Sequence, residues 1–197
     1  SKKDDLIVVN SDNPKILEIA KALDVFPIKR PKNISGDKSS TEETIFHTLK
    51  KVEQLGHFRF LCLLQPTSPF RTKETLRKLT NEFNANIYDS VLTVKSVHNL
   101  YWKNNKYAKP IYSSRQMRQD FNNYAESGMF YKSKISKIIS SKNRVSGKTL
   151  LIENKEIEST EIDTQFDLKI AKLLINELEA DWKKEVLETN KIIKSMM

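Results

Sequence analysis

Short apolar runs alternate with amphipathic segments through the first half of the chain, and this pattern restricts the fold more than any other feature. The runs have the length of buried strands and lie at residues 6–9, 25–28, 58–64 and 90–94. Helix signals come between them, including Pro14 behind the N-cap candidates Asp12 and Asn13, and a capping box of Ser40 and Glu43. Strand–helix alternation of this kind predicts an α/β fold with a three-layer, mainly parallel, twisted sheet.

The second half of the chain departs from that alternation. Residues 96–124 are polar and aromatic without helical periodicity, and Asn104 and Asn105 between aromatic residues predict a hairpin. We interpret this segment as an insertion that leaves the sheet, either a lid or an interface arm. Later elements are expected at 128–131 (strand), 134–139 (helix), 150–152 (strand) and from Thr164 (long helix). Residues 1–197 are predicted to form a single domain.

Composition narrows the class of protein. The 197 residues can bury a substantial core, and no apolar run is long enough to span a bilayer. With no signal peptide visible, we expect a cytoplasmic protein that does not bind a membrane. The net charge is +9, but the basic residues are dispersed, so we do not expect nucleic-acid binding. The single cysteine, Cys62, lies in an apolar run and is expected to be a core thiol.

The stretch Gln65-Pro-Thr-Ser-Pro69 follows directly on the apolar run at 58–64. A parallel strand that ends in such a turn delivers its last side chains to the carboxyl edge of the sheet, where open α/β folds bind ligands. The amide of Gln65 and the hydroxyls of Thr67 and Ser68 can hydrogen-bond a polar ligand without carrying charge. An ordinary proline turn leading into the next helix explains the prolines equally well.

Charged residues at two other places are candidates for binding an anionic ligand. Arg30 follows the run at 25–28 and can contact a phosphate or carboxylate, although a solvated surface arginine fits as well. Glu161 and Asp163 stand two residues apart, which in an extended segment places both carboxylates on one side, as suits Mg²⁺. Capping of the final helix by Asp163 or Thr164 is the competing explanation.

Four stretches match the motifs of one known family in the same order. They are Val8-Val-Asn-Ser-Asp12, Arg30-Pro31 followed by Asp37 and Ser39-Ser-Thr41, Leu64-Gln-Pro-Thr-Ser-Pro-Phe-Arg71, and Glu161-Ile-Asp-Thr164. Together they resemble the CMP-sialic-acid synthetases, the acylneuraminate cytidylyltransferase family. The third stretch is close to that family's most specific motif, and the resemblance covers nearly the whole chain. It implies a fold like that of the nucleotide-diphospho-sugar transferases.

The resemblance also implies a reaction. The anomeric hydroxyl of a nonulosonic (sialic-type) acid sugar would attack the α-phosphorus of CTP, with Mg²⁺ as cofactor, giving pyrophosphate and the CMP-sugar for cell-surface glycans. The residues implied are Arg30 and Ser40 for the nucleotide, Glu161 and Asp163 for the metal with Asp163 also catalytic, and Gln65, Thr67, Ser68, Tyr124 and Ser127 for the sugar. The insertion 96–124 would cross to the partner subunit of a homodimer.

The chain differs from that family in two places. It starts after the family's first strand and the basic, glycine-containing loop for the CTP phosphates, so we expect on the order of 40 residues, one βα unit, to be missing. Where the sialic-acid enzymes carry Arg-Pro-Asn-Gly, this chain has Ala125-Glu-Ser-Gly128, which is more similar to the branch that activates pseudaminic acid. The sugar therefore stays open. The alternative function is that of a catalytically dead or truncated relative acting as a binding or scaffold subunit.

Overall fold

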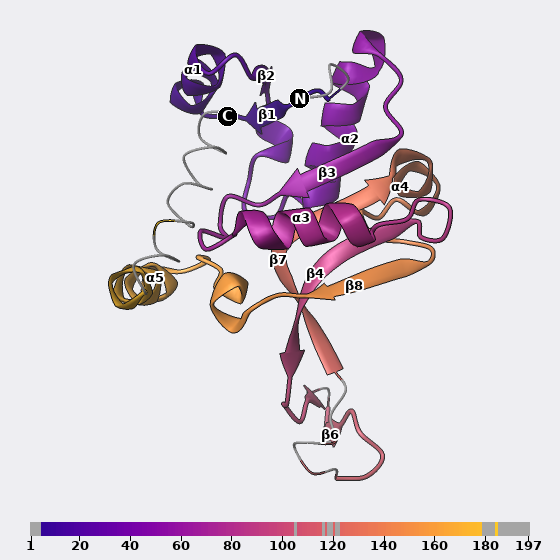
Figure 1. The fold of residues 1–197 in the computed structure, drawn as a ribbon, viewed down its shortest axis with the longest axis vertical. Coiled ribbons are helices and arrows are strands. Elements are labelled where there is room, and N and C mark those ends of the chain that lie inside the picture. The colour runs from indigo at the N-terminus through magenta and orange to yellow at the C-terminus, as the bar shows by residue number, and fades with distance from the viewer. Residues whose placement is uncertain are drawn as a thin grey trace.

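The computed structural model describes residues 5–178, apart from 105, 116, 118–119 and 121–122, together with residue 184. Its larger sheet has the strand order β3 (Phe60–Leu64), β7 (Asn123–Lys134), β4 (Ser90–Val97) and β8 (Thr149–Glu153), as Figure 1 shows. β4 pairs parallel with β8, whereas β7 pairs antiparallel with both β3 and β4, so only β7 opposes the common strand direction of this sheet. A second sheet pairs β1 (Val8–Ser11) parallel with β2 (Phe26–Lys29).

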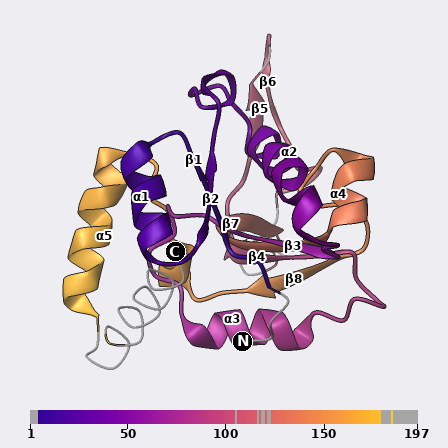
Figure 2. The same cartoon turned by 90° about the horizontal axis from the view of Figure 1, so that it is seen from above.

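Helices cover both faces of the four-stranded sheet (Figure 2). On one face α3 (Lys73–Glu82) packs through Leu79, and Phe83 directly behind it, against Val91, Phe130 and Ile152. The other face is covered by α2 (Thr41–Val52) and α4 (Ile135–Ser141). Helix α1 (Pro14–Ala22) connects β1 to β2, and α5 (Gln165–Glu177) follows β8. The three layers confirm the predicted α/β class. No helix among the described residues is long and apolar enough to cross a bilayer.

The helices begin where the cap residues of the sequence place them. Asn13 caps α1 by accepting from Lys15 N at 2.9 Å. Ser40 and Glu43 form the expected capping box at the start of α2, and Thr72 caps α3. Short 3₁₀ turns complete the connections at Lys32–Ile34, Glu53–Leu55 and Glu156–Ser159. Local cap chemistry therefore predicted the starts of α1 and α2 correctly.

The prediction that Cys62 is a core thiol is wrong. Cys62 is exposed, and Leu64 on the same strand is 39% exposed. Both lie on β3, which is an edge strand: within the described part of the chain it pairs only with β7. An apolar run predicts a strand, but whether the strand is central or at an edge depends on long-range pairing that the run itself does not encode.

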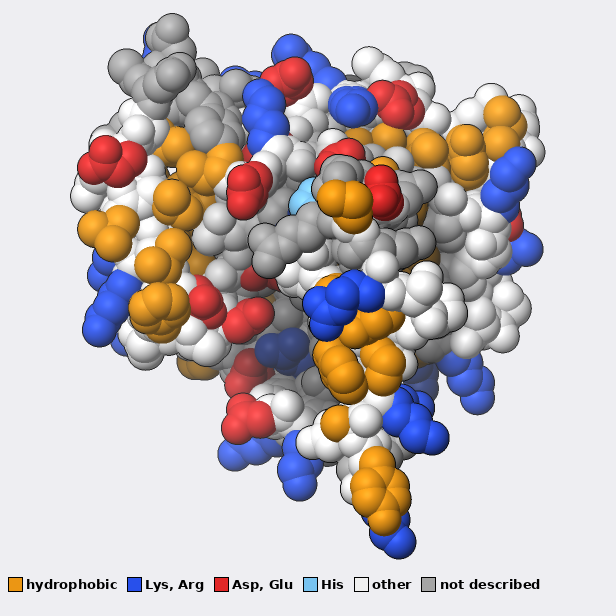
Figure 3. Space-filling view, turned by 90° about the horizontal axis from the view of Figure 1, so that it is seen from below, with side chains coloured by type: hydrophobic (Ala, Val, Ile, Leu, Met, Phe, Trp, Pro, Cys, Tyr) orange, Lys and Arg blue, Asp and Glu red, His pale blue; other side chains and the backbone are white. Residues whose placement is uncertain are grey.

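Residues 96–124 leave the sheet as an arm (Figure 1). Strands β4 and β7 stay paired to Val97 and Asn123, beyond which β5 (Trp102–Asn104) and β6 (Ala108–Pro110) form an antiparallel hairpin. The hairpin expected around Asn104 is therefore present, while Asn105 lies outside the described residues. Apolar side chains on the arm face solvent, Tyr107 being 71% exposed. Figure 3, which views the molecule from the side on which the arm projects, shows exposed hydrophobic side chains at several places on this face.

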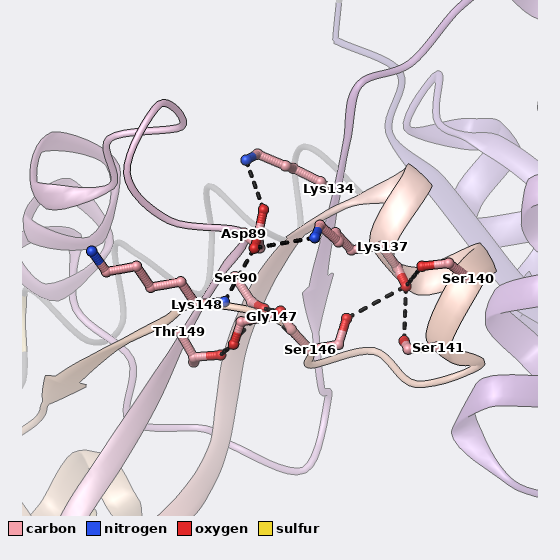
Figure 4. Close-up of polar contacts among 10 residues, drawn as sticks. All are labelled: Asp89, Ser90, Lys134, Lys137, Ser140, Ser141, Ser146, Gly147, Lys148 and Thr149. Atoms are coloured by element: carbon pink, nitrogen blue, oxygen red, sulfur yellow. Dashed lines mark hydrogen bonds and ion pairs between the residues drawn. The ribbon is translucent and has the colours of Figure 1, made fainter.

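At the opposite end of β4, the carboxylate of Asp89 connects the ends of β4, β7 and β8 through hydrogen bonds (Figure 4). Oδ1 accepts from Lys134 Nζ at 2.8 Å, and Oδ2 accepts from Lys148 N at 3.1 Å and lies 3.5 Å from Lys137 Nζ. Gly147, with φ of +72°, lies against this carboxylate, since a Cβ there would meet Oδ2 at 2.3 Å. The hydrogen bond from Lys134 is the largest of the influences that lower the pKa of Asp89 to about 2.

We expect Asp89→Asn to flatten the acid dependence of stability. The folded pKa of about 2 lies below the value of about 3.9 for an unfolded aspartate. The stabilisation is therefore complete above about pH 4 and is lost as pH falls through about 2. Urea midpoints measured from about pH 5 down to about pH 2 should fall less steeply in the variant. Asp37→Asn, in an exposed loop, is the control, and parallel curves for wild type and Asp89→Asn would contradict the assignment.

Candidate active site

The site is built around a bulge in β7. The register of β7 against β4 shifts at Thr93, opposite which residues 127–130 are accommodated. The bulge leaves the backbone N–H of Phe130 without a backbone partner on β4. Thr93 Oγ1 accepts from this N–H at 3.1 Å and so satisfies it. Gly128, inside the bulge, has φ of +64°, the left-handed region that glycine adopts at little cost.

Two of the predicted site residues meet at Gly128. A Cβ placed on this glycine would lie 1.7 Å from Oε1 of Glu161 and 3.0 Å from Oε1 of Gln65. Both side chains therefore occupy the space that any residue other than glycine would fill. Gln65 follows β3 and Glu161 precedes α5, so the fold brings together two motifs that are far apart in the sequence.

Arg71 fixes the shape of the proline turn after β3. The side chain belongs to a residue that is 4% exposed, and Nη2 donates to the carbonyl oxygens of Gln65 and Ser68, at 2.7 Å in the case of Ser68. Burial lowers the pKa of Arg71 to about 10, so the group remains charged at neutral pH and its hydrogen bonds are charge-assisted. The position of Arg71 directly after the turn is the only signal of this role in the sequence.

A backbone hydrogen bond joins the proline turn, residues 65–69, to the acidic segment, residues 161–164. Ile162 N donates to Thr67 O at 2.9 Å, and the Ile162 side chain packs on the cluster around Phe70. Glu161 and Asp163 are its two neighbours in the chain, and alternation in an extended segment directs both away from that cluster. The paired carboxylates and the proline turn therefore form one local unit.

The carboxylate of Glu161 sits in a partly desolvated, negatively charged environment. Burial raises the pKa of Glu161, the charges of Asp163 and Glu126 raise it further, and Lys95 acts in the opposite direction. A divalent cation between Glu161 and Asp163 would relieve this repulsion, and carboxylate oxygens are the donors that Mg²⁺ prefers. No group of three His, Cys, Asp or Glu residues in the described ranges could hold a metal unaided, so phosphate oxygens would complete the ligand set.

Capping of the last helix was the competing explanation for Asp163, but its neighbour Thr164 is the residue whose side chain caps that helix. Thr164 is the N-cap of α5 and accepts from Asp167 N at 3.2 Å. The Oδ2 atom of Asp167 accepts in return from Thr164 N at 2.7 Å and from Asp163 N at 3.2 Å. Asp163 thus contributes only its backbone to the cap, and the helix does not use its carboxylate.

Two buried hydroxyls lie in the same segments. Ser68 in the proline turn and Ser127 in the bulge are both 0% exposed, and within the described residues neither hydroxyl oxygen has a hydrogen-bond partner. A buried polar atom without a partner costs about 1–3 kcal/mol. A polar ligand at the site would supply the missing bonds.

Other predicted residues lie elsewhere on the fold. Arg30 is held at the end of β2 by Asp12 at 3.1 Å and by Thr44 at 3.3 Å, so it is not a simple solvated arginine. Ser40 caps α2 by accepting from Glu43 N at 3.2 Å. Tyr124, 44% exposed, lines a surface pocket at the base of the arm. The geometry therefore unites Gln65, Ser127, Glu161 and Asp163 but places Arg30, Ser40 and Tyr124 in separate groups.

A comparison with solved structures finds a protein of the same fold as this chain. The solved structure of 4-diphosphocytidyl-2C-methyl-D-erythritol synthase from Anaerococcus prevotii superposes with a TM-score of 0.63 at 15% identity, covering 88% of this chain and 82% of that one. At this level of identity the likeness shows that the two chains share a fold.

Curated relatives give the narrower relationship. CMP-N,N'-diacetyllegionaminic acid synthase of Legionella pneumophila is 27% identical over 179 residues, covering 86% of this chain and 77% of that protein. N-acylneuraminate cytidylyltransferase A of Danio rerio is 28% identical over 172 residues, covering 83% of this chain but only 39% of the relative. No family model matches the chain. The resemblance to the acylneuraminate cytidylyltransferases that the motifs indicated is confirmed.

Proposed function

We propose that this chain is a CTP-dependent cytidylyltransferase that transfers CMP to a nonulosonic acid and releases pyrophosphate. The observation that carries the proposal is the meeting of Gln65 and Glu161 at Gly128, because it joins two motifs that resemble the acylneuraminate cytidylyltransferases. The names of the two curated relatives, a CMP-sugar-acid synthase and an N-acylneuraminate cytidylyltransferase, support the same reaction.

The groups around Gly128 form the sugar side of the proposed site. Gln65 offers a neutral amide, and the hydroxyls of Thr67, Ser68 and Ser127 offer donors and acceptors to the polar substituents of a sugar acid. The two buried serine hydroxyls favour this role, since a ligand would satisfy both. Tyr124 would contact the sugar from the base of the arm.

The nucleotide side of the proposed site lies at the ends of β1 and β2. Arg30 would bind CTP, and its contacts with Asp12 and Thr44 hold the guanidinium in one orientation. Its Nε atom is buried and has no hydrogen-bond partner among the residues described, which leaves one donor for a ligand. Ser40 would contribute from the first turn of α2.

Glu161 and Asp163 would hold Mg²⁺ together with phosphate oxygens. When bound, the ion neutralises charge on the triphosphate. The anomeric hydroxyl oxygen forms a bond to the α-phosphorus, and the bond from that phosphorus to the bridging oxygen breaks, so pyrophosphate leaves with the electron pair. The hydroxyl proton passes to the carboxylate of Asp163. Positioning of the two reactants supplies much of the rate.

The arm supports a homodimer. Its exposed aromatic residues and the pocket at its base, lined in part by Leu100, Tyr101 and Ile111, form an apolar surface that a second copy would cover. The stretch around Gly128 is more similar to the pseudaminic-acid branch than to the sialic-acid enzymes, although Ala125 and Glu126 depart from that branch, so the sugar acid stays open. The compartment we propose is the cytoplasm, where CTP is available.

Pyrophosphate release tests the proposal. The full natural chain, with any residues that precede Ser1 in its gene, is incubated with CTP and Mg²⁺ and, separately, with sialic, legionaminic and pseudaminic acid. We expect pyrophosphate with at least one sugar, none without sugar, and none after the metal is removed by a chelator. Absence of release with all three sugars would leave the scaffold function as the remaining interpretation.

A further inference from the structure

The strongest unexplained feature outside the proposed site is a buried carboxylate on the short helix that precedes the acidic segment. Glu158 is 0% exposed. Its Oε1 accepts from Thr72 Oγ1 at 2.6 Å and from Thr75 Oγ1 at 2.8 Å. Its Oε2 accepts from Thr75 Oγ1 at 2.9 Å and from Lys155 N at 3.1 Å. Both oxygens are thus engaged by donors from two distant parts of the chain.

Burying a carboxylate is expensive unless hydrogen bonds replace its water shell. Here three donors do so, at distances from 2.6 to 3.1 Å, and hydrogen bonds to a carboxylate are charge-assisted. A side chain needed only to fill this space could be apolar at lower cost. The arrangement therefore indicates that the orientation of the two segments, rather than their burial alone, is what Glu158 contributes.

The two segments that Glu158 connects are those that form the proposed site. Thr72 caps α3 and follows Arg71, which holds the carbonyl oxygens of the proline turn. On the other side, Glu158 stands three residues before Glu161 in the chain. The Ile162–Thr67 hydrogen bond at 2.9 Å joins the same two segments closer to the site.

We propose that Glu158 is a positioning residue, whose buried carboxylate clamps the start of α3 to the acidic segment and so sets Glu161 and Asp163 in register with Gln65. Glu158 touches no reacting atom and acts through these residues. The catalytic part of this inference rests on the proposed cytidylyltransferase function, whereas the structural part concerns the segment around Ile162 alone.

Glu158→Gln tests the inference with little change in size. One oxygen becomes an NH₂ group that cannot accept from a threonine hydroxyl. We expect kcat for pyrophosphate release to fall by about 10-fold or more, because a small misplacement of site groups is costly. KM for CTP should stay within about twofold, since Arg30 lies on separate elements. Glu74→Gln on α3, whose exposed carboxylate lies 3.1 Å from Lys155 Nζ, is the matched control and should leave kcat unchanged.

Amide hydrogen exchange gives a readout that does not depend on activity. In Glu158→Gln the Ile162 amide should exchange about 10-fold faster or more, while the amide of Val91 in β4 keeps its wild-type rate. If the carboxylate has a merely structural role, Glu158→Gln should instead raise amide exchange rates throughout the fold and leave kcat intact. That result would overturn the proposal. If Glu158→Gln does not fold, Thr75→Val serves in its place, because it removes two of the hydrogen bonds at nearly constant volume. The same fall in kcat and the same faster exchange at Ile162 are expected.

The two proposals fail separately. If the wild-type protein releases no pyrophosphate with any sugar acid, the proposed function is wrong, and the exchange rate of Ile162 still decides whether Glu158 positions the acidic segment. If the wild type is active and both Glu158→Gln and Thr75→Val retain its kcat and its Ile162 exchange rate, the positioning role is wrong and the enzyme assignment stands.

Discussion

Gly128→Ala is expected to lower kcat for pyrophosphate release by about 100-fold or more. The added Cβ would come 1.7 Å from Oε1 of Glu161, so the carboxylate must leave its place beside Gln65. The φ of +64° adds backbone strain of about 1 kcal/mol or more for a residue with a side chain. Steady-state kinetics with CTP and the accepted sugar acid measure the effect.

Gly36→Ala is the matched control for that substitution. A Cβ at Gly36 has no atom within 4 Å, and its backbone lies outside the left-handed region. This variant should retain wild-type kcat. Urea unfolding of both variants separates loss of the site from loss of the fold. A Gly128→Ala protein that is folded and fully active would show that Glu161 and Gln65 need not meet at this position.

Asp163→Asn is expected to have a comparable or larger effect, a loss of about 100- to 1,000-fold in kcat. The substitution keeps the size of the side chain but removes one of the two charges proposed to hold Mg²⁺. The concentration of Mg²⁺ for half-maximal activity should rise in the same variant. Glu156→Gln, at an exposed position in the 3₁₀ turn before the acidic segment, should change neither quantity.

The same variant carries a pH signature. Asp163 is one of the charges that raise the pKa of Glu161 above its ordinary value, second to burial. Because Glu161 must be ionised to bind a cation, activity in the wild type should be lost as pH falls through that raised pKa. Removing the charge of Asp163 lowers the pKa of Glu161, so the acid limb of the kcat/KM profile should move to lower pH. An acid limb that stays in place would show that Glu161 is not the titrating group.

The fold was predictable from the sequence wherever local chemistry determines it. Cap residues such as Asn13 and Ser40 placed the helix starts, and the apolar runs placed the strands. Strand neighbours were not predictable in this way. Cys62 was assigned to the core because its run is apolar, yet β3 lies at an edge. The direction of β7 is set by the long connection through the arm, which no local pattern encodes.

The residues of the candidate site likewise divide into those that local motifs predicted and those that depend on long-range contacts. Gln65 and Glu161 were found through motifs, and the structure places them together. The reason they can approach each other, Gly128 in a bulge, depends on a register shift between distant strands. Glu158 stands among several acidic residues and reads as a surface charge, because its partners Thr72 and Thr75 lie far away in the sequence.

Paramagnetic broadening by Mn²⁺ tests the central claim, that the proline turn and the acidic segment form one site that binds the metal next to the sugar. Mn²⁺ is added to ¹⁵N-labelled protein in the presence of CTP, and the amide signals are followed. We predict that the signals of Gly128, Gln65 and Ile162 broaden first, that the signal of Asp89 at the start of β4 broadens less, and that Asp163→Asn abolishes the effect. Broadening that spares Gly128, or that persists in Asp163→Asn, would contradict the site.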